Sequence, residues 1–85
     1  MPEVGEVVRA LSGREAGRLH VITAVCGDRV GIADGRHRKL CDPKKKNPRH
    51  IMSIGVKLRP EEYSTDRRLR ISLRTLPVIG TQQQS

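Results

Sequence analysis

Residues 34–50, "DGRHRKLCDPKKKNPRH", form the segment of the chain with the clearest chemical character. They include seven Lys and Arg and two His, and Leu40 is the one clear apolar side chain. Between residues 36 and 50 a single carboxylate, Asp42, opposes this charge, so the segment supplies most of the chain's net charge of +8. Like charges at this density repel one another, and a polyanion relieves the repulsion. The segment therefore indicates a polyanion-binding surface.

The near-absence of aromatic residues limits how such a polyanion is recognised. Tyr63 is the only Phe, Trp or Tyr residue among the 85. Modules that read single-stranded bases usually stack them on aromatic side chains. We therefore expect binding through phosphate contacts and shape rather than through base stacking.

No residue pattern indicates catalysis or a cofactor. The sequence has no recognisable nucleophile with its base, and "GREAG" lacks the Gly-Lys-Ser/Thr ending of a nucleotide-phosphate loop. Cys26 and Cys41 belong to no Cys-x-x-Cys pair, so we expect buried or half-buried thiols and no metal site. We predict a protein that is not an enzyme and has no small-molecule substrate. The N-terminal "MPEVGEVVRA" has no signal-peptide or membrane-span pattern, which favours a cytoplasmic location without membrane contact.

Alternating apolar residues and closely spaced turn signals predict an all-β domain over residues 1–60. We expect a small antiparallel barrel of five short strands, at residues 4–11, 18–26, 29–33, 36–41 and 50–58. Gly27-Asp28 and Asp34-Gly35 suit tight hairpin turns. Two prolines, Pro43 and Pro48, predict a loop for "DPKKKNP".

The residues after Pro60 predict a short C-terminal helix within residues 61–77. Ser64 or Thr65 can cap it, and a leucine stripe, Leu69, Leu73 and Leu76, recurs at helical spacing. We expect this stripe to pack on the barrel, with a partner-binding face as the alternative. Pro77 and Gly80 predict the end of the helix, and residues 78–85 a disordered tail.

The two strands around "SGREAG", in "VGEVVRALSGREAGRLHVITAV", resemble the KOW motif, with Gly17 just before the second strand. With the continuation "GIADGRHRKLCDPKKKNPRHI", residues 3–52 resemble the small bacterial KOW-domain RNA-binding proteins, which are similar to the archaeal and eukaryotic large-subunit ribosomal protein family L-fourteen-e. The resemblance implies an SH3-like barrel without catalytic activity. It also implies a ribosome-associated role in translation, with structured RNA, above all ribosomal RNA, as the partner.

The resemblance also implies which residues meet the RNA. They fall into the loop around "SGREAG" and the basic segment, and they are Gly13, Arg14, Gly17, Arg36, Arg38, Lys39, Lys44, Lys45, Lys46 and Asn47. Arg18, Arg49 and His50 adjoin these stretches and complete the predicted set. Glycines permit positive φ or a close phosphate approach, an arginine can fork onto a phosphate, and lysines supply point charges. We expect the two stretches to form one continuous basic surface.

Two other interpretations of the basic segment remain open. It can be a solvated loop that binds nothing, and "PKKK" is also typical of a nuclear-import signal. The alternative function is a protein–protein adaptor that docks on the ribosome or on RNA polymerase, as KOW domains of transcription elongation factors do. An adaptor needs an apolar patch with little charge, and the leucine stripe is the one candidate.

Overall fold

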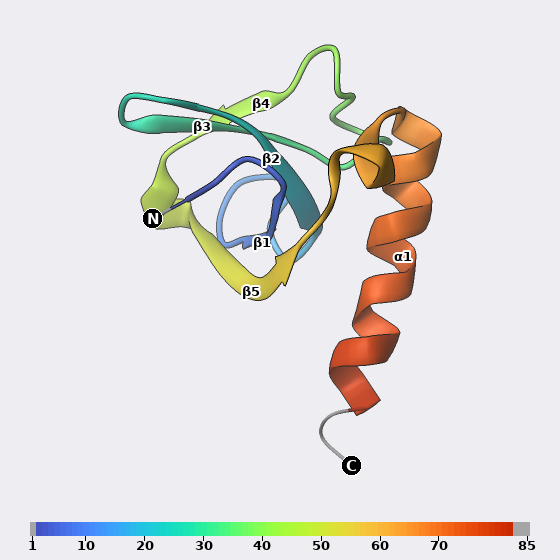
Figure 1. Cartoon of the computed structure of the whole chain (residues 1–85). Helices are drawn as coiled ribbons and strands as arrows, with labels where there is room; N and C mark the ends of the chain where they lie inside the picture. The colour runs from blue at the N-terminus through green and yellow to red at the C-terminus, as the bar shows by residue number, and fades with distance from the viewer. Residues whose placement is uncertain (1, 83–85) are drawn as a thin grey trace.

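The computed structural model describes residues 2–82 of the chain, and the side chains of residues 2–76. Five strands form one antiparallel sheet in the order β4-β3-β2-β1-β5, and a helix, α1, stands beside it (Figure 1). The elements are β1 Glu6–Ala10, β2 Leu19–Cys26, β3 Arg29–Ala33, β4 Lys44–Lys46, β5 Ile51–Lys57 and α1 Asp66–Gln82. Short 3₁₀-helices, Pro48–His50 and Pro60–Tyr63, flank β5. In the described part of the chain the sheet is not closed, and β4 and β5 are its edges.

Apolar alternation places side chains in two core clusters, one on each face of the sheet. On one face Val7, Val21 and Ala33 pack with Leu69 and Leu73 of α1. On the opposite face a second cluster contains Val8, Ile22, Val30 and Ile32. The mostly β composition, the five strands and the C-terminal helix agree with the sequence prediction.

The fourth strand lies elsewhere than predicted, because residues 36–41 form a loop and Lys44–Lys46 form β4. The carboxylate of Asp34 accepts hydrogen bonds from the backbone N–H groups of Arg36 and Arg38, both at 2.9 Å, and this folds the chain into a turn. Pro43, which lacks a backbone donor, directly precedes the strand. Lysine has low strand propensity, but exposed edge strands commonly carry it.

The predicted helix cap and leucine stripe are confirmed. Thr65 Oγ1 accepts a hydrogen bond from the N–H of Arg68 at 3.1 Å, which caps the first turn. Leu69 and Leu73 are buried, and Leu76 packs against the same cluster. The stripe therefore holds α1 on the sheet.

The predicted end of the helix at Pro77 and Gly80 is wrong, since α1 begins at Asp66, directly after its predicted cap, but continues past both residues to Gln82 (Figure 1). Proline has a φ close to that of a helix and removes one backbone hydrogen bond, so the turns on either side can continue. Residues 78–82, predicted as disordered tail, are helical. Residues 83–85 of that predicted tail lie outside the described residues.

Cys26 and Cys41 are exposed free thiols, contrary to the prediction of burial. Cys26 ends β2 next to the hairpin turn, and Cys41 lies in the loop before β4, so neither faces a core cluster. Among the described residues, no helix has both the length and the apolar character needed to cross a membrane.

Candidate functional site

Residues 11–18 join β1 to β2, and the two glycines among them have the predicted backbone geometry. Gly13 and Gly17 both have φ of 84°, in the left-handed region that favours glycine. A Cβ atom on Gly17 would meet nothing within 4 Å, whereas one on Gly13 would lie 2.9 Å from Nζ of Lys46. A partner's backbone can therefore come close over Gly17, while the space beside Gly13 is already filled.

Lys46 is among the residues predicted to contact RNA, but its side chain is buried and its ammonium group is already paired within the protein. Its ammonium group donates to the Glu15 carboxylate and, at 2.8 Å, to the carbonyl oxygen of Ser12. Side chains alternate along a strand, so Lys45 points the other way and is exposed, while Lys44 is half-buried 4.0 Å from Glu15. The hydrogen bond from Lys46 lowers the pKa of Glu15 below its ordinary 4.5, and burial opposes this only in part.

The loop between β3 and β4 is tied to the start of α1. The Leu40 N–H donates to Asp66 Oδ1 at 2.8 Å, and Arg70 Nη1 donates to the carbonyl oxygen of Gly35 at 2.8 Å. Gly35 has φ of 80°, and a Cβ there would lie 2.5 Å from the carbonyl oxygen of Asp66. This contact requires glycine and brings the basic loop against the helix.

The turn is further stabilised by Asp34. Burial raises the pKa of Asp34, but the backbone N–H groups of Arg38 and Arg36 outweigh this and lower it overall. The carboxylate therefore stays ionised as the anchor of the loop. Its role is to orient the arginines that follow it.

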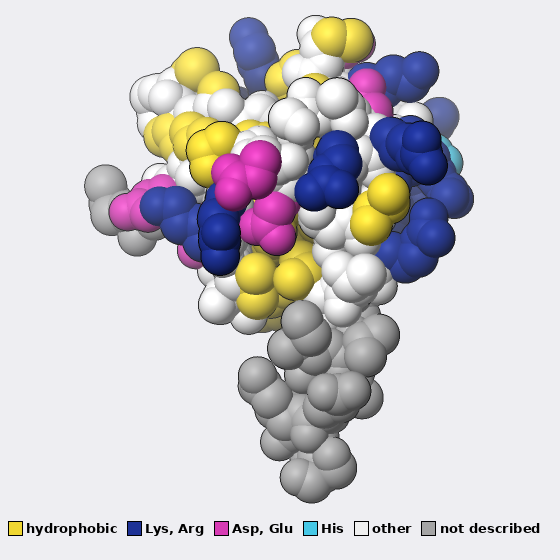
Figure 2. Space-filling view, turned by 45° about the vertical axis from the view of Figure 1, so that its right-hand side comes forward, with side chains coloured by type: hydrophobic (Ala, Val, Ile, Leu, Met, Phe, Trp, Pro, Cys, Tyr) yellow, Lys and Arg dark blue, Asp and Glu magenta, His cyan; other side chains and the backbone are white. Residues whose placement is uncertain are grey.

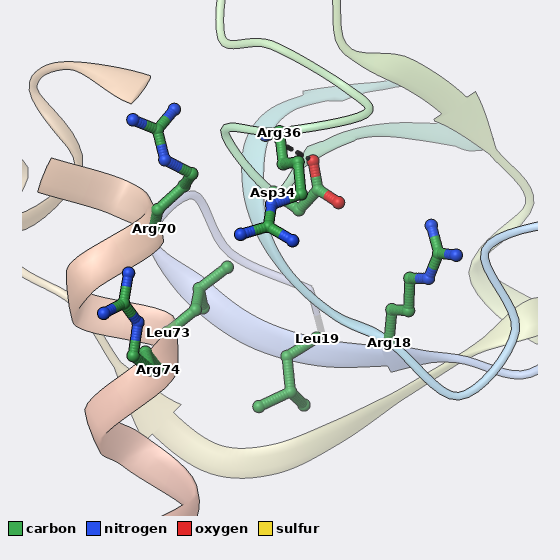
Figure 3. Close-up of a pocket in the computed structure, with 7 residues that line it drawn as sticks. All are labelled: Arg18, Leu19, Asp34, Arg36, Arg70, Leu73 and Arg74. Carbon is green, nitrogen blue, oxygen red and sulfur yellow. Dashed lines mark hydrogen bonds between the residues drawn. The ribbon is translucent and has the colours of Figure 1, made fainter. Parts of the chain in front are cut away.

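Four arginines line a groove of about 320 Å³ between the sheet and α1, which we call the helix groove. Arg70 and Arg74 come from α1, and Arg18 and Arg36 from the side of the sheet (Figure 3). Leu19 and Leu73 lie between them and give the groove an apolar floor. The groove thus combines several guanidinium groups with an apolar surface and with the carboxylate of Asp34.

A second hollow of about 320 Å³, the loop pocket, lies next to the helix groove. It is lined by the loop and strand residues Arg14, Glu15, Arg18, His20, His37 and Arg38. Arg18 lines both hollows, and its Nη1 donates to His37 Nδ1 at 3.0 Å. The structure thus brings together the predicted Arg14, Arg18, Arg36 and Arg38. Figure 2 shows Lys and Arg side chains gathered on one side of the face in view, with a histidine among them.

The remaining predicted residues line neither hollow. Asn47 caps the 3₁₀-helix Pro48–His50 by accepting from the N–H of Arg49 at 2.9 Å, so its side chain has a structural role. Lys39, Arg49 and His50 are exposed.

Sequence reasoning missed Arg70 and Arg74. The sequence pattern that could have identified them is short. The two arginines are spaced i, i+4, and each directly follows a leucine of the stripe, Leu69 or Leu73. A residue beside a buried stripe lies at the border of the helix contact. Which part of the domain would lie opposite could not be read from the sequence.

Among the described residues, no group of three His, Cys, Asp or Glu side chains is placed to hold a metal ion. No protein-family model and no curated protein matches the chain. The fold and the site define a small, mostly β domain with an arginine surface that spans the sheet, a loop and a helix.

Proposed function

We propose that this protein is an RNA-binding module of the SH3-like KOW kind, which holds structured RNA, above all ribosomal RNA, through phosphate and shape contacts. It acts in the cytoplasm, in association with the ribosome, and catalyses no reaction. The observation that carries the proposal is the position of Arg18, which lines both hollows and joins their arginines into one surface.

Arginine suits this role better than lysine. Its planar guanidinium group presents a fork of donors that matches two phosphate oxygens, and less entropy is lost per hydrogen bond. The arginines of the two hollows come from the loop before β2, the loop between β3 and β4, and α1, so their relative positions depend on the fold. A surface of this kind favours RNA whose phosphates are already held in a matching arrangement, as in a folded RNA.

The apolar floor of the helix groove adds a second kind of contact. Leu73 is buried but Leu19 is only half-buried, so Leu19 leaves an apolar surface between the guanidinium groups. Sugar and base faces can lie on such a surface while their phosphates meet the arginines. The groove therefore suits a nucleic acid better than a small inorganic anion.

The alternative function, a protein–protein adaptor, would need the leucine stripe of α1 to be exposed as its docking patch. Leu69 and Leu73, the stripe that an adaptor would have exposed, are buried against the sheet. The charge on the surface that remains favours a polyanionic partner.

The test is a salt titration of RNA affinity with matched arginine variants. If about four to six phosphates are met, log K against log salt has a slope of roughly −3 to −5 for wild type on an RNA hairpin. We expect Arg36→Ala with Arg74→Ala to make the slope shallower by about 2. The hairpin carries a fluorescent label, and anisotropy reports binding.

The control is Arg67→Ala with Arg68→Ala, which removes the same charge from exposed positions of α1 that line neither hollow. We expect its slope to stay close to that of wild type. Equal effects of the two double variants, or a wild-type slope near zero, would reject the proposed surface. Equal wild-type affinity for poly-U and for the hairpin would reject the preference for structured RNA.

A further inference from the structure

Asp34 places one carboxylate among the four arginines of the helix groove. Its Oδ1 accepts hydrogen bonds from the backbone N–H groups of Arg36 and Arg38, both at 2.9 Å, whereas Oδ2 accepts from no group within residues 2–76. Solvent reaches Oδ2, because the one buried side-chain nitrogen or oxygen without a partner in that part of the chain belongs to His20. Figure 3 shows one oxygen of Asp34 on its hydrogen bond to Arg36 and the other turned away from it. The groove therefore contains a free and accessible carboxylate oxygen.

The arginines around this carboxylate do not neutralise it. Asp34 forms no ion pair within residues 2–76. Burial raises the pKa of Asp34, but the backbone N–H groups of Arg38 and Arg36 lower it overall, so the carboxylate is ionised at pH 7. A phosphodiester beside Oδ2 would be repelled and has no hydrogen to donate to it. The group that fits beside Asp34 is therefore uncharged and carries an N–H or O–H donor.

The arginines of the groove differ in the hydrogen bonds that they already make. Arg70 donates to a loop carbonyl oxygen at 2.8 Å, and Arg18 donates to a histidine ring at 3.0 Å. The guanidinium groups of Arg36 and Arg74 are exposed and donate to no group within residues 2–76, so each can fork onto two neighbouring acceptors. Leu19 is half-buried beside them. The groove thus offers one acceptor, two free donor forks and an apolar surface.

Among the four bases of RNA, guanine matches this combination best. Its O6 and N7 are adjacent acceptors, which a guanidinium fork meets with two hydrogen bonds. Its N1–H and N2–H groups are adjacent donors on the other side of O6, and both can point at one carboxylate oxygen. Adenine and uracil have no two adjacent acceptors on an exposed edge. Cytosine has its donor and its acceptors on a single edge, where an aspartate and an arginine would compete for space.

We propose that the helix groove takes one unpaired guanine of the bound RNA, whose N1–H and N2–H groups donate to Oδ2 of Asp34 while Arg36 or Arg74 forks onto its O6 and N7. The face of the base lies on Leu19, and the other arginines meet neighbouring phosphates. A guanine turned out of a loop or a bulge exposes both of these edges. This inference rests on the proposed RNA binding and adds the base that the groove recognises.

The experiment combines Asp34→Asn with a change of one base in the RNA, because coupling between the two isolates the contact. The asparagine amide keeps an oxygen for the two backbone N–H groups but places a donor, Nδ2, where Oδ2 was. Both proteins are titrated with hairpins whose loop is uridine except at one position, which carries guanine, adenine or cytosine. We expect wild type to bind the guanine loop about tenfold more tightly than the other two, as for hydrogen bonds to a charged group. Asp34→Asn should bind the three loops within about twofold of one another.

A purely structural or electrostatic role of Asp34 predicts a different result. Asp34→Asn removes a negative charge beside four arginines, so affinity for every hairpin would rise alike and the preference for one loop would not change. An unchanged guanine preference in Asp34→Asn would therefore overturn the inference. Equal wild-type affinity for the three loops, or a preference for adenine or cytosine, would also overturn it, although salt-dependent binding by the arginine surface still stands. Failure of wild type to bind any hairpin would instead reject the proposed function.

A second measurement needs no change at Asp34 and covers the case in which Asp34→Asn does not fold. The loop guanine is replaced by inosine, which lacks the N2 amino group, or by 7-deazaguanine, which lacks the N7 acceptor. We expect each analogue to bind wild type about fivefold more weakly than guanine, which corresponds to one hydrogen bond. Loss of the 7-deazaguanine effect in Arg36→Ala or in Arg74→Ala identifies the arginine that meets the base. An analogue that binds wild type as tightly as guanine, or a 7-deazaguanine effect that persists in both variants, would overturn the inference.

Discussion

The ammonium group of Lys46 donates a hydrogen bond to the carboxylate of Glu15, which lies 31 residues earlier in the chain. The two side chains are 7% and 8% exposed. The pair ties the edge strand β4 to the loop between β1 and β2. One member of the most basic run in the sequence therefore stabilises the fold and is withdrawn from any partner.

Loss of Lys46 should destabilise the protein far more than loss of its neighbour. Lys46→Ala leaves the buried Glu15 carboxylate without its main partner, and we expect the free energy of unfolding to fall by about 3 kcal/mol. Lys45→Ala removes the same charge from an exposed position and should change the free energy of unfolding by less than about 0.5 kcal/mol. Urea denaturation measures both, and equal effects would contradict a structural role for the pair.

Stability should also depend on acid through Glu15. The Lys46 hydrogen bond lowers the pKa of Glu15 in the folded state below its ordinary 4.5. The stabilisation is therefore complete above pH 4.5 and is lost as the pH falls through the lower, folded-state pKa. We expect the free energy of unfolding to decrease below about pH 4.5 more steeply in wild type than in Glu15→Gln, as measured by urea denaturation at several pH values. Parallel curves for the two proteins would contradict this prediction.

RNA affinity should depend on the position of a positive charge as well as on the net charge of the protein. Removal of a charge inside the two hollows should therefore weaken binding more than removal of a charge outside them. Arg18 lines both hollows, so Arg18→Ala should weaken hairpin binding about tenfold, as expected for a charge-assisted hydrogen bond. Lys45→Ala removes one charge outside both hollows and should weaken binding less than about twofold. Anisotropy titrations at one salt concentration compare the two. Similar losses would mean that only the overall field of the protein attracts the RNA.

Gly35 should tolerate substitution less well than Gly17, although both have positive φ. An alanine Cβ at residue 35 would lie 2.5 Å from the carbonyl oxygen of Asp66, so α1 or the loop has to move. We expect Gly35→Ala to lower the free energy of unfolding by about 2 kcal/mol or more, and Gly17→Ala, with free space around its Cβ, by about 1 kcal/mol. Denaturation midpoints test this order, and a more harmful change at Gly17 would contradict it.

The sequence by itself determined the elements whose signals are local. Alternating apolar residues predicted β1, β2, β3 and β5, and Gly27 predicted the hairpin between β2 and β3. A hydroxyl residue before a leucine stripe predicted the capped start of α1. These predictions succeed because side-chain periodicity and turn geometry depend on residues only a few positions apart.

Only the tertiary structure decided the roles of the charged residues. The local pattern predicts a loop for "KKK", yet pairing with β3 and burial of Lys46 on Glu15 make it a strand. In the same way, Arg70 and Arg74 join Arg18 and Arg36 because α1 packs along the sheet. The physical reason is that the energy of a charged side chain depends on which groups lie within a few ångströms of it. Here those groups come from distant parts of the chain.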